Sequence, residues 1–243
     1  MPHLPFAWFA TAAFGASLGL FLYCYLFVFG PAPSASIPAL SSSVPALSAI
    51  VSAPSLVNLA LFTAFALHHS VFARTGVKDA VKRSVPAPLE RAVYTLVASL
   101  LFALVCWWWQ PVEGVAWTLT GVWRLLGYGA QLAGLVLTVL GARALDVWEL
   151  AGVRQVSPAS QRAVVLKTDG LYGFVRHPLY FAWILFVFGS PEMTMTRLSF
   201  AIISTVYLAA AIPFEERSLI ETFGPEYASY QRKVRWRMLP GIY

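Results

Sequence analysis

Charged residues are scarce in this chain. They make up 12% of the sequence, against 58% for hydrophobic residues, whereas soluble domains carry about a quarter of charged residues. This composition excludes an ordinary soluble domain and predicts an integral membrane protein. The net charge of +6 raises the question of a nucleic-acid partner, but the basic residues lie in blocks between apolar runs. That pattern is a topology signal, so we expect membrane lipids and no nucleic acid as partners.

Cysteine is almost absent, and the usual nucleotide-binding glycine motif is missing. The two cysteines, Cys24 and Cys106, lie inside apolar runs without a CxxC partner, which argues against a disulfide framework and against a zinc site. No GxGxxG follows a strand pattern, because Gly127 and Gly129 belong to an apolar helix. We therefore expect two buried thiols, no metal and no Rossmann-type domain.

Long apolar runs, by contrast, are frequent. A helix of roughly 20 residues crosses a hydrocarbon core of about 30 Å, and five runs fit: 6–29, 56–72, 92–109, 122–142 and 197–214. A sixth, 179–191, is short and needs tilt or packing in a hairpin. The sequence predicts an all-α fold, a polytopic membrane helical bundle of about six spans with a cytoplasmic C-terminal helical cap. We expect one domain over 1–243, with N-terminal spans in 1–142 and a catalytic part in 143–243.

The basic residues predict the orientation. Five lie in each of the blocks 74–91, 143–176 and 217–237, and only Arg124 and Arg197 lie elsewhere. All three blocks fall on one side if both termini are cytoplasmic, as expected for a bacterial inner membrane. The site would then be cytoplasmic too.

A ridge of small residues marks the fourth span. Ala130, Gly134, Thr138 and Ala142 follow one another at intervals of four, and such ridges let helix backbones approach closely in lipid. The pattern predicts a tight helix contact and carries no chemistry.

The first polar cluster is "KTDGLYGFVRHPLY". Pro178 restricts His177 and predicts that a helix begins at the proline. Arg176 and His177 would then lie just before a helix N-terminus, where free N–H groups attract anions. An isolated RHP is equally compatible with headgroup anchors at a helix entry.

The second cluster is "PFEERSLIETFGPEYASYQRKV". Pro213 removes a backbone donor, which frees the carbonyl around Ala209 and predicts a kink before Glu215 and Glu216. Adjacent helical residues point about 100° apart, so one glutamate should face inward and the other solvent or a basic partner. A carboxylate at the membrane boundary is costly unless it is paired, which makes a function for one of them the default hypothesis.

A helix stop follows these acids. Gly224 should end the helix and Pro225 begin a new one, on which Tyr227 and Tyr230 share a face. An amphipathic lid on the membrane surface has this pattern, and so does a plain stop-transfer tail.

Together these residues carry a resemblance. "GLYGFVRHPLY", one further span and "EERSLIETFGPEYASYQRKV" resemble the signature of the integral-membrane methyltransferases related to isoprenylcysteine carboxyl methyltransferase and the phospholipid methyltransferases. The upstream stretches "LHHSVFAR" and "ELAGVRQV" resemble the methanethiol S-methyltransferase branch and related nitric-oxide-reductase accessory proteins. At Ala182 the chain departs from the family, which usually has glycine there.

The resemblance implies S-adenosylmethionine as methyl donor, S-adenosylhomocysteine as product, and a small thiol or lipid-like acceptor. Glu215 or Glu216 would pair with the donor's ammonium, and Arg217 or Arg176 with its carboxylate. The candidate cofactor-binding residues are Lys167, Gly170, Tyr172, His177, Pro178, Tyr180, Glu215, Glu216, Arg217, Tyr227 and Tyr230. The candidate catalytic residues are Arg154, Arg176, Glu216 and His69.

Three functions stay open at this point. Methylation of a thiol needs alignment more than proton transfer, because neighbouring cations raise the thiolate fraction, so no dedicated general base is required. A prenylcysteine carboxylate or a phospholipid amine is the alternative acceptor. A non-catalytic accessory protein of nitrogen-oxide or haem metabolism is the alternative from another class.

Overall fold

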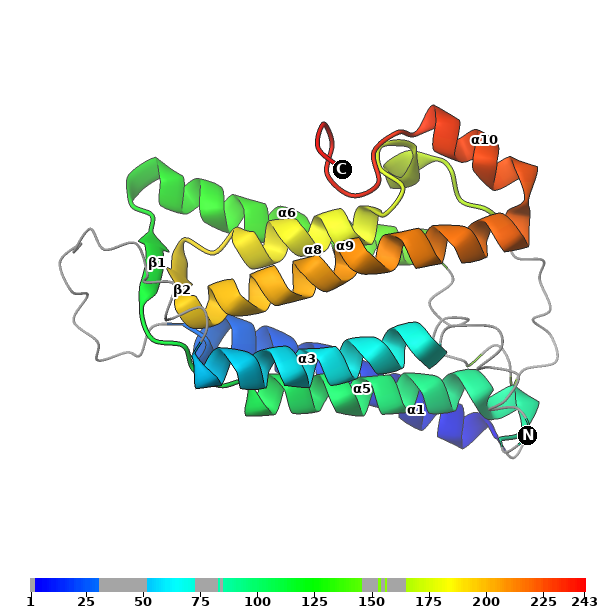
Figure 1. The fold of residues 1–243 in the computed structure, drawn as a ribbon, viewed down its shortest axis with the longest axis horizontal. Coiled ribbons are helices and arrows are strands. Elements are labelled where there is room, and N and C mark those ends of the chain that lie inside the picture. Colours follow the sequence, from blue (N-terminus) through cyan, green and yellow to red (C-terminus); the bar gives the residue numbers. More distant parts are fainter. Residues whose placement is uncertain are drawn as a thin grey trace.

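The computed structural model describes residues 3–30, 52–72, 83, 85–145, 153, 156 and 165–243. These residues form long helices and one short two-stranded ribbon (Figure 1). In chain order the elements are α1 (Leu4–Tyr23), η1 (Cys24–Val28), α3 (Ala53–Phe72), η2 (Ala87–Leu89), α5 (Glu90–Trp108), β1 (Val115–Thr118), α6 (Gly121–Ala144), η5 (Gly170–Gly173), α8 (Pro178–Phe188), β2 (Glu192–Thr194), α9 (Met195–Phe223) and α10 (Pro225–Lys233).

The expected membrane bundle is confirmed. Five helical segments, Leu4–Val28, Ala53–Phe72, Ala87–Trp108, Gly121–Ala144 and Met195–Phe223, are long and apolar enough to cross a membrane. The sixth, α8, is an apolar helix of 11 residues, about 16 Å long at 1.5 Å per residue. It is too short to cross the hydrocarbon alone, as its sequence indicated.

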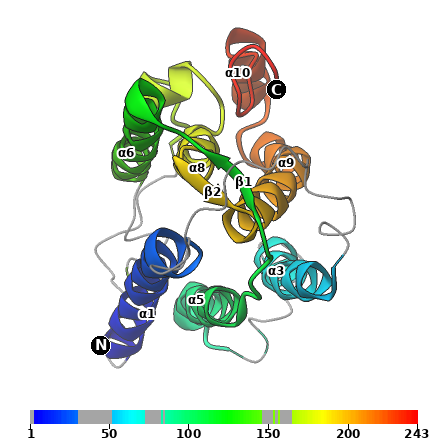
Figure 2. The ribbon, with the colours of Figure 1, turned by 90° about the vertical axis from the view of Figure 1, so that its left-hand side faces the viewer.

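The long helices run side by side along one axis (Figure 1). Viewed end-on, α1, α3 and α5 lie together in one half, and α6, α8 and α9 in the other (Figure 2). The ribbon, in which β1 pairs antiparallel with β2, closes one end of the bundle. We call this the β end and the opposite end the α10 end. The starts of α1, α5 and α8 and the end of α9 lie at the α10 end (Figure 1).

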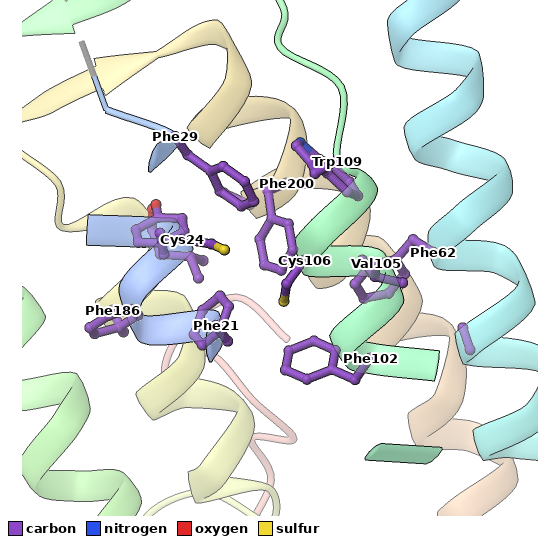
Figure 3. Packing of buried hydrophobic residues seen from close by; sticks show 14 residues of the cluster. Phe21, Cys24, Phe29, Phe62, Phe102, Val105, Cys106, Trp109, Phe186 and Phe200 are labelled. Carbon is purple, nitrogen blue, oxygen red and sulfur yellow. The ribbon is translucent and has the colours of Figure 1, made fainter. Parts of the chain in front are cut away.

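Aromatic side chains join the two halves. Phe21 of α1 stacks on Trp183 of α8 and on Phe200 of α9, with ring centroids 4.8 and 5.4 Å apart. Phe200 is fully buried and also meets Trp109 edge-on at 4.9 Å. Figure 3 shows this core between α1, α5 and α9. Each such aromatic pair adds about 0.5–1.5 kcal/mol beyond simple burial, so the core fixes how the halves meet.

The helices α6 and α8 approach each other at glycines, which refines the predicted ridge. A Cβ at Gly134 would lie 2.6 Å from the carbonyl oxygen of Ala182, and one at Gly127 would lie 2.8 Å from that of Gly189. A Cβ at Gly141 would lie 2.9 Å from Leu179. Ala130 of the predicted ridge belongs to the same contact, because a Cβ at Gly189 would lie 3.0 Å from the Cβ of Ala130. Ala182, where the family usually has glycine, is fully buried in this contact.

A buried arginine fixes the β end, a role that no local sequence pattern predicts. Arg197, 7% exposed, donates from Nε to the carbonyl of Tyr25 at 2.9 Å and from Nη2 to that of Leu26 at 2.7 Å. Its Nη1 donates to Glu192 O at 2.6 Å and to Ser190 Oγ at 3.1 Å. Tyr25 and Leu26 lie in the π-helical turn η1. Helix-end carbonyls need donors when they are out of water, and Arg197 supplies them.

Candidate active site

Three polar segments meet at the α10 end. They are the turn that leads into α8, the last turns of α9, and α10 with the chain that follows it (Figure 1). As predicted, α8 begins at Pro178, with His177 as its N-cap residue. Gly224, at φ +55°, ends α9, and Pro225 is the first residue of α10. The hairpin of α8 and α9 thus brings the two polar clusters together.

Arg176 ties these segments to one another. Its buried guanidinium donates from Nε to Glu216 Oε1 at 2.6 Å, and from Nη1 to the carbonyls of Val234 and Arg235 at 2.6 and 2.9 Å. The backbone N–H of Arg176 also donates to Trp236 O at 2.9 Å. A charged donor with three acceptors holds the last part of the chain against the start of α8.

Glu216 is the glutamate that faces inward. Its side chain is 5% exposed, and besides Arg176 it contacts Gln231 Nε2 at 3.1 Å and Arg237 Nε at 3.4 Å. His177 Nε2 lies 3.5 Å from Glu216 Oε1. A buried carboxylate is tolerated when it is paired and hydrogen-bonded in this way. Glu216 and Arg176 therefore neutralise each other at the centre of the site.

Glu215 points in a different direction and keeps part of its surface accessible. Its side chain is 38% exposed, and one carboxylate oxygen accepts a hydrogen bond from the Tyr180 hydroxyl. The other oxygen lies 3.4 Å from Nδ1 of His177. The rings of His177 and Tyr180 stack at 5.3 Å with an interplanar angle of 14°. The expected division between the two acids is thus present, with Glu215 as the partly open one.

Three tyrosines lie close to the charged cluster. Tyr227 and Tyr230 of α10 are buried and meet edge-on at 5.7 Å, and the Tyr230 hydroxyl donates to the carbonyl of Tyr172 at 2.6 Å. Burial raises the pKa of Tyr172 to about 12 and raises the pKa of Tyr227 and Tyr230 further. All three hydroxyls therefore stay protonated at neutral pH, and that of Tyr230 acts as a hydrogen-bond donor.

The carbonyl freed by Pro213 has a partner. The helix α9 continues through the proline for ten more residues, and the Tyr243 hydroxyl lies 3.3 Å from Ala209 O. Arg237 Nη1 donates to the same hydroxyl at 3.0 Å. Because Pro213 cannot donate to residue 209, this carbonyl is where the end of the described chain attaches to α9.

The other candidate residues lie at varied distances from this centre. Lys167 and Arg217 are exposed, and Gly170 is exposed with φ +58°, a conformation suited to glycine. His69 lies in the last turn of α3, at the same end of the bundle. Arg154 lies outside the described residues. Pro178 is buried at the start of α8.

Gln231 and Arg237 contact Glu216 but were not among the predicted residues. Gln231 follows Tyr227 by four positions, so the face shared by the tyrosines could have revealed it. Arg237 lies beyond α10 in irregular chain, where no periodicity indicates which way a side chain points.

Two groups of the cluster can take a further polar partner. The half-open carboxylate of Glu215 can receive an ammonium. Nε2 of His177 is buried and makes no hydrogen bond within the described residues, so it has capacity for a further polar partner. Among the same residues, His, Cys, Asp and Glu form no group of three that could hold a metal ion.

An apolar helical bundle with a paired, buried charge cluster at one end defines a polytopic integral membrane protein with a site at the membrane boundary. The model of the family described as "Protein of unknown function (DUF1295)" matches residues 88–234, from α5 to the end of α10. A methanethiol S-methyltransferase of Crocosphaera subtropica is 35% identical over 184 residues, covering 74% of this chain and 72% of the relative. The chain therefore belongs to this family and is a relative of the methanethiol S-methyltransferases.

Two other relatives mark the breadth of the family. A methanethiol S-methyltransferase of Mycobacterium tuberculosis is 34% identical over 191 residues, covering 74% of this chain and 75% of the relative. A protein-S-isoprenylcysteine O-methyltransferase of Dictyostelium discoideum is 35% identical over 82 residues, which cover 32% of this chain and 34% of the relative. No solved structure matches the chain.

Proposed function

We propose that this protein transfers a methyl group from S-adenosylmethionine to a small thiol, methanethiol being the simplest. The relatives named for that reaction match about three quarters of the chain, whereas the relative named for prenylcysteine matches only a third. The observation that carries the proposal is the pair of adjacent glutamates, one buried against Arg176 and the other left half open beside His177 and Tyr180.

In this proposal Glu215 binds the ammonium of the donor. Glu216 is already neutralised by Arg176 and Arg237, so Glu215 carries the accessible negative charge. His177 and Tyr180 lie on one side of it, and Tyr227 and Tyr230 form the facing wall on α10. We place Lys167, Gly170 and Tyr172 at the entrance, and Arg217 near the donor carboxylate.

The donor, when bound, supplies an electrophilic methyl on a sulfonium. The protein then has to align a sulfur nucleophile with that methyl and exclude water, and alignment of this kind lowers a barrier substantially. Aromatic walls at the edge of an apolar bundle suit both tasks. A small volatile thiol can reach such a site from the lipid as well as from water.

The membrane orientation follows from the same proposal. The donor is a soluble cytoplasmic metabolite, and basic residues gather on the cytoplasmic side of membrane proteins. The described basic residues outside the β end lie with the site, at the ends of α5, α6, α9 and α10. We therefore place the α10 end and both described ends of the chain in the cytoplasm of a bacterial cell.

The test is donor binding and methyl transfer by the full chain purified in detergent. Calorimetric titration with S-adenosylmethionine and S-adenosylhomocysteine should show binding, and headspace gas chromatography should detect dimethyl sulfide from methanethiol. Glu215→Gln should weaken donor binding by about tenfold or more, the loss of one charged hydrogen bond of 1.5–3 kcal/mol. Glu221→Gln, exposed on the same helix, is the matched control and should bind as the parent does.

Three outcomes separate the alternatives. Methyl transfer to a prenylcysteine and not to methanethiol would show that the acceptor group is a carboxylate. Absence of donor binding together with a haem absorption band would make the protein a non-catalytic haem-handling factor. Equal donor affinity in Glu215→Gln and Glu221→Gln would remove Glu215 from the site.

A further inference from the structure

A histidine and a tyrosine form a hydrogen-bonded pair next to the candidate site, on helices that the donor-binding residues do not use. The Tyr94 hydroxyl of α5 lies 2.8 Å from Nδ1 of His69 and 3.2 Å from the carbonyl oxygen of the same residue. His69 belongs to the last turn of α3. The residue as a whole is exposed, and its ring packs on Phe65 at 5.8 Å.

The pair lies at the depth of Glu215. The helices α3 and α9 run in the same direction (Figure 1), and Thr63 of α3 hydrogen-bonds to Tyr207 of α9. From there His69 is six residues further, about 9 Å, and Glu215 eight residues further, about 12 Å. Tyr94 also lies within electrostatic range of Glu215 and of Tyr180. The pair therefore lies at the end of the bundle that holds the site, and Tyr94 is the member within electrostatic range of it.

The two contacts of Tyr94 favour one tautomer of His69 over the other. A tyrosine has one hydroxyl hydrogen. If the Tyr94 hydrogen is donated to the carbonyl oxygen of His69, Nδ1–H of His69 can donate to the Tyr94 oxygen, and both contacts are hydrogen bonds. If the Tyr94 hydrogen is donated to Nδ1, the Tyr94 oxygen and the carbonyl oxygen of His69 lie 3.2 Å apart with no hydrogen between them. The first arrangement satisfies every group, and it leaves Nε2 with a free lone pair.

We propose that His69 is the general base that accepts the proton of the thiol, and that Tyr94 is the positioning residue that fixes its tautomer. Nε2 takes the proton from the sulfur as the sulfur attacks the methyl carbon. The bond between that carbon and the donor sulfur breaks, and its electron pair stays on the donor as a neutral thioether. The proton then passes from Nε2 to water. This inference rests on the proposed function, and it assigns to the protein a proton acceptor that alignment alone does not supply.

Other charged and titratable groups lie near the pair. His68 stacks on Tyr94 at 5.6 Å, and Arg91, one turn earlier on α5, and Glu215 are within electrostatic range of Tyr94. His68 and His69 are adjacent on a helix and point about 100° apart, and Nδ1 of His68 is buried. His68 therefore offers a matched control that leaves the His69 imidazole in place.

The test compares two thiols of different acidity. An alkanethiol is mostly protonated at neutral pH and needs a base, whereas an aromatic thiol is largely ionised and does not. His69→Gln should lower kcat/KM for methanethiol by about 100-fold or more and change that for thiophenol by less than about fivefold. Tyr94→Phe should lower only the methanethiol value, by about three- to tenfold. His68→Gln should keep the ratio of the two values at that of the parent.

The tautomer gives a readout independent of turnover. With ¹⁵N-labelled histidine in the full chain, and His69→Gln to assign the signal, NMR should show the His69 proton on Nδ1 in the parent. In Tyr94→Phe this preference should be lost.

A proton on Nε2 in the parent, or an equal loss of methanethiol and thiophenol turnover in His69→Gln, would overturn the inference. A parent that methylates no thiol would instead refute the proposed function. Calorimetric binding of S-adenosylhomocysteine shows that each variant is folded. If His69→Gln does not fold, the thiol comparison and the tautomer of Tyr94→Phe test the inference instead.

Discussion

Replacing Glu216 with alanine should damage the fold before it damages donor binding. The Glu216 and Arg176 side chains are 5% and 7% exposed and 2.6 Å apart, so removing the carboxylate leaves a buried cation without its counter-charge. Breaking a buried pair in this way costs about 3–5 kcal/mol. A change of 1 kcal/mol shifts the melting temperature of a chain this size by about 2–4 °C, so Glu216→Ala should melt about 6–20 °C lower.

The assay can use the two native cysteines. Cys24 and Cys106 are free and buried, so a thiol-reactive dye reports unfolding in detergent as the temperature rises. Glu215→Ala is the comparison, because its carboxylate is partly exposed and loses one charged hydrogen bond, from Tyr180, so it should shift the midpoint by less than Glu216→Ala does.

The same pair gives an internal check. Arg176→Met combined with Glu216→Ala removes both charges, so the double variant should be more stable than the sum of the two single effects. If Glu216→Ala melts within about 2 °C of the parent and loses donor binding, then Glu216 is a ligand contact and its structural role is wrong.

Two further predictions concern the bundle itself. Gly134→Val should lower the melting temperature and methyl transfer, because a Cβ there would lie 2.6 Å from Ala182 O, whereas Gly129→Val, with no atom within 4 Å, should match the parent. Arg197→Met should cost several kcal/mol because four acceptors lose a buried donor; Arg124→Met, which breaks an exposed pair with Glu192, should cost less than about 1 kcal/mol. Dye-monitored melting measures both, and equal shifts within either comparison would contradict the packing described above.

Local signals predicted much of the structure at the α10 end. Pro178, Gly224 and Pro225 set the helix boundaries observed, because their backbone preferences act within one or two residues. The 100° step between Glu215 and Glu216 predicted that only one would be buried. The role of the individual site residues, by contrast, stays a proposal.

Local sequence signals could not predict the contacts between segments that lie far apart in the chain. The small-residue ridge predicted on the fourth span includes Ala130 and Gly134, which do approach the α8 segment, but the close contacts of Gly127 and Gly141 lie outside that pattern. Nothing local indicated that Arg197 would cap the turn at Tyr25 and Leu26, because the two segments are about 170 residues apart.

The sequence by itself determined that this chain enters a membrane, where its helices begin and end, and which residue types gather at one end of them. Those properties depend on composition and on short-range backbone preference. Only the tertiary structure decided that Arg176 neutralises Glu216 and leaves Glu215 half open, and that Tyr94 hydrogen-bonds to His69 at the same end of the bundle. The physical reason is that a pairing of charges or hydrogen-bonding groups from different helices depends on how those helices pack.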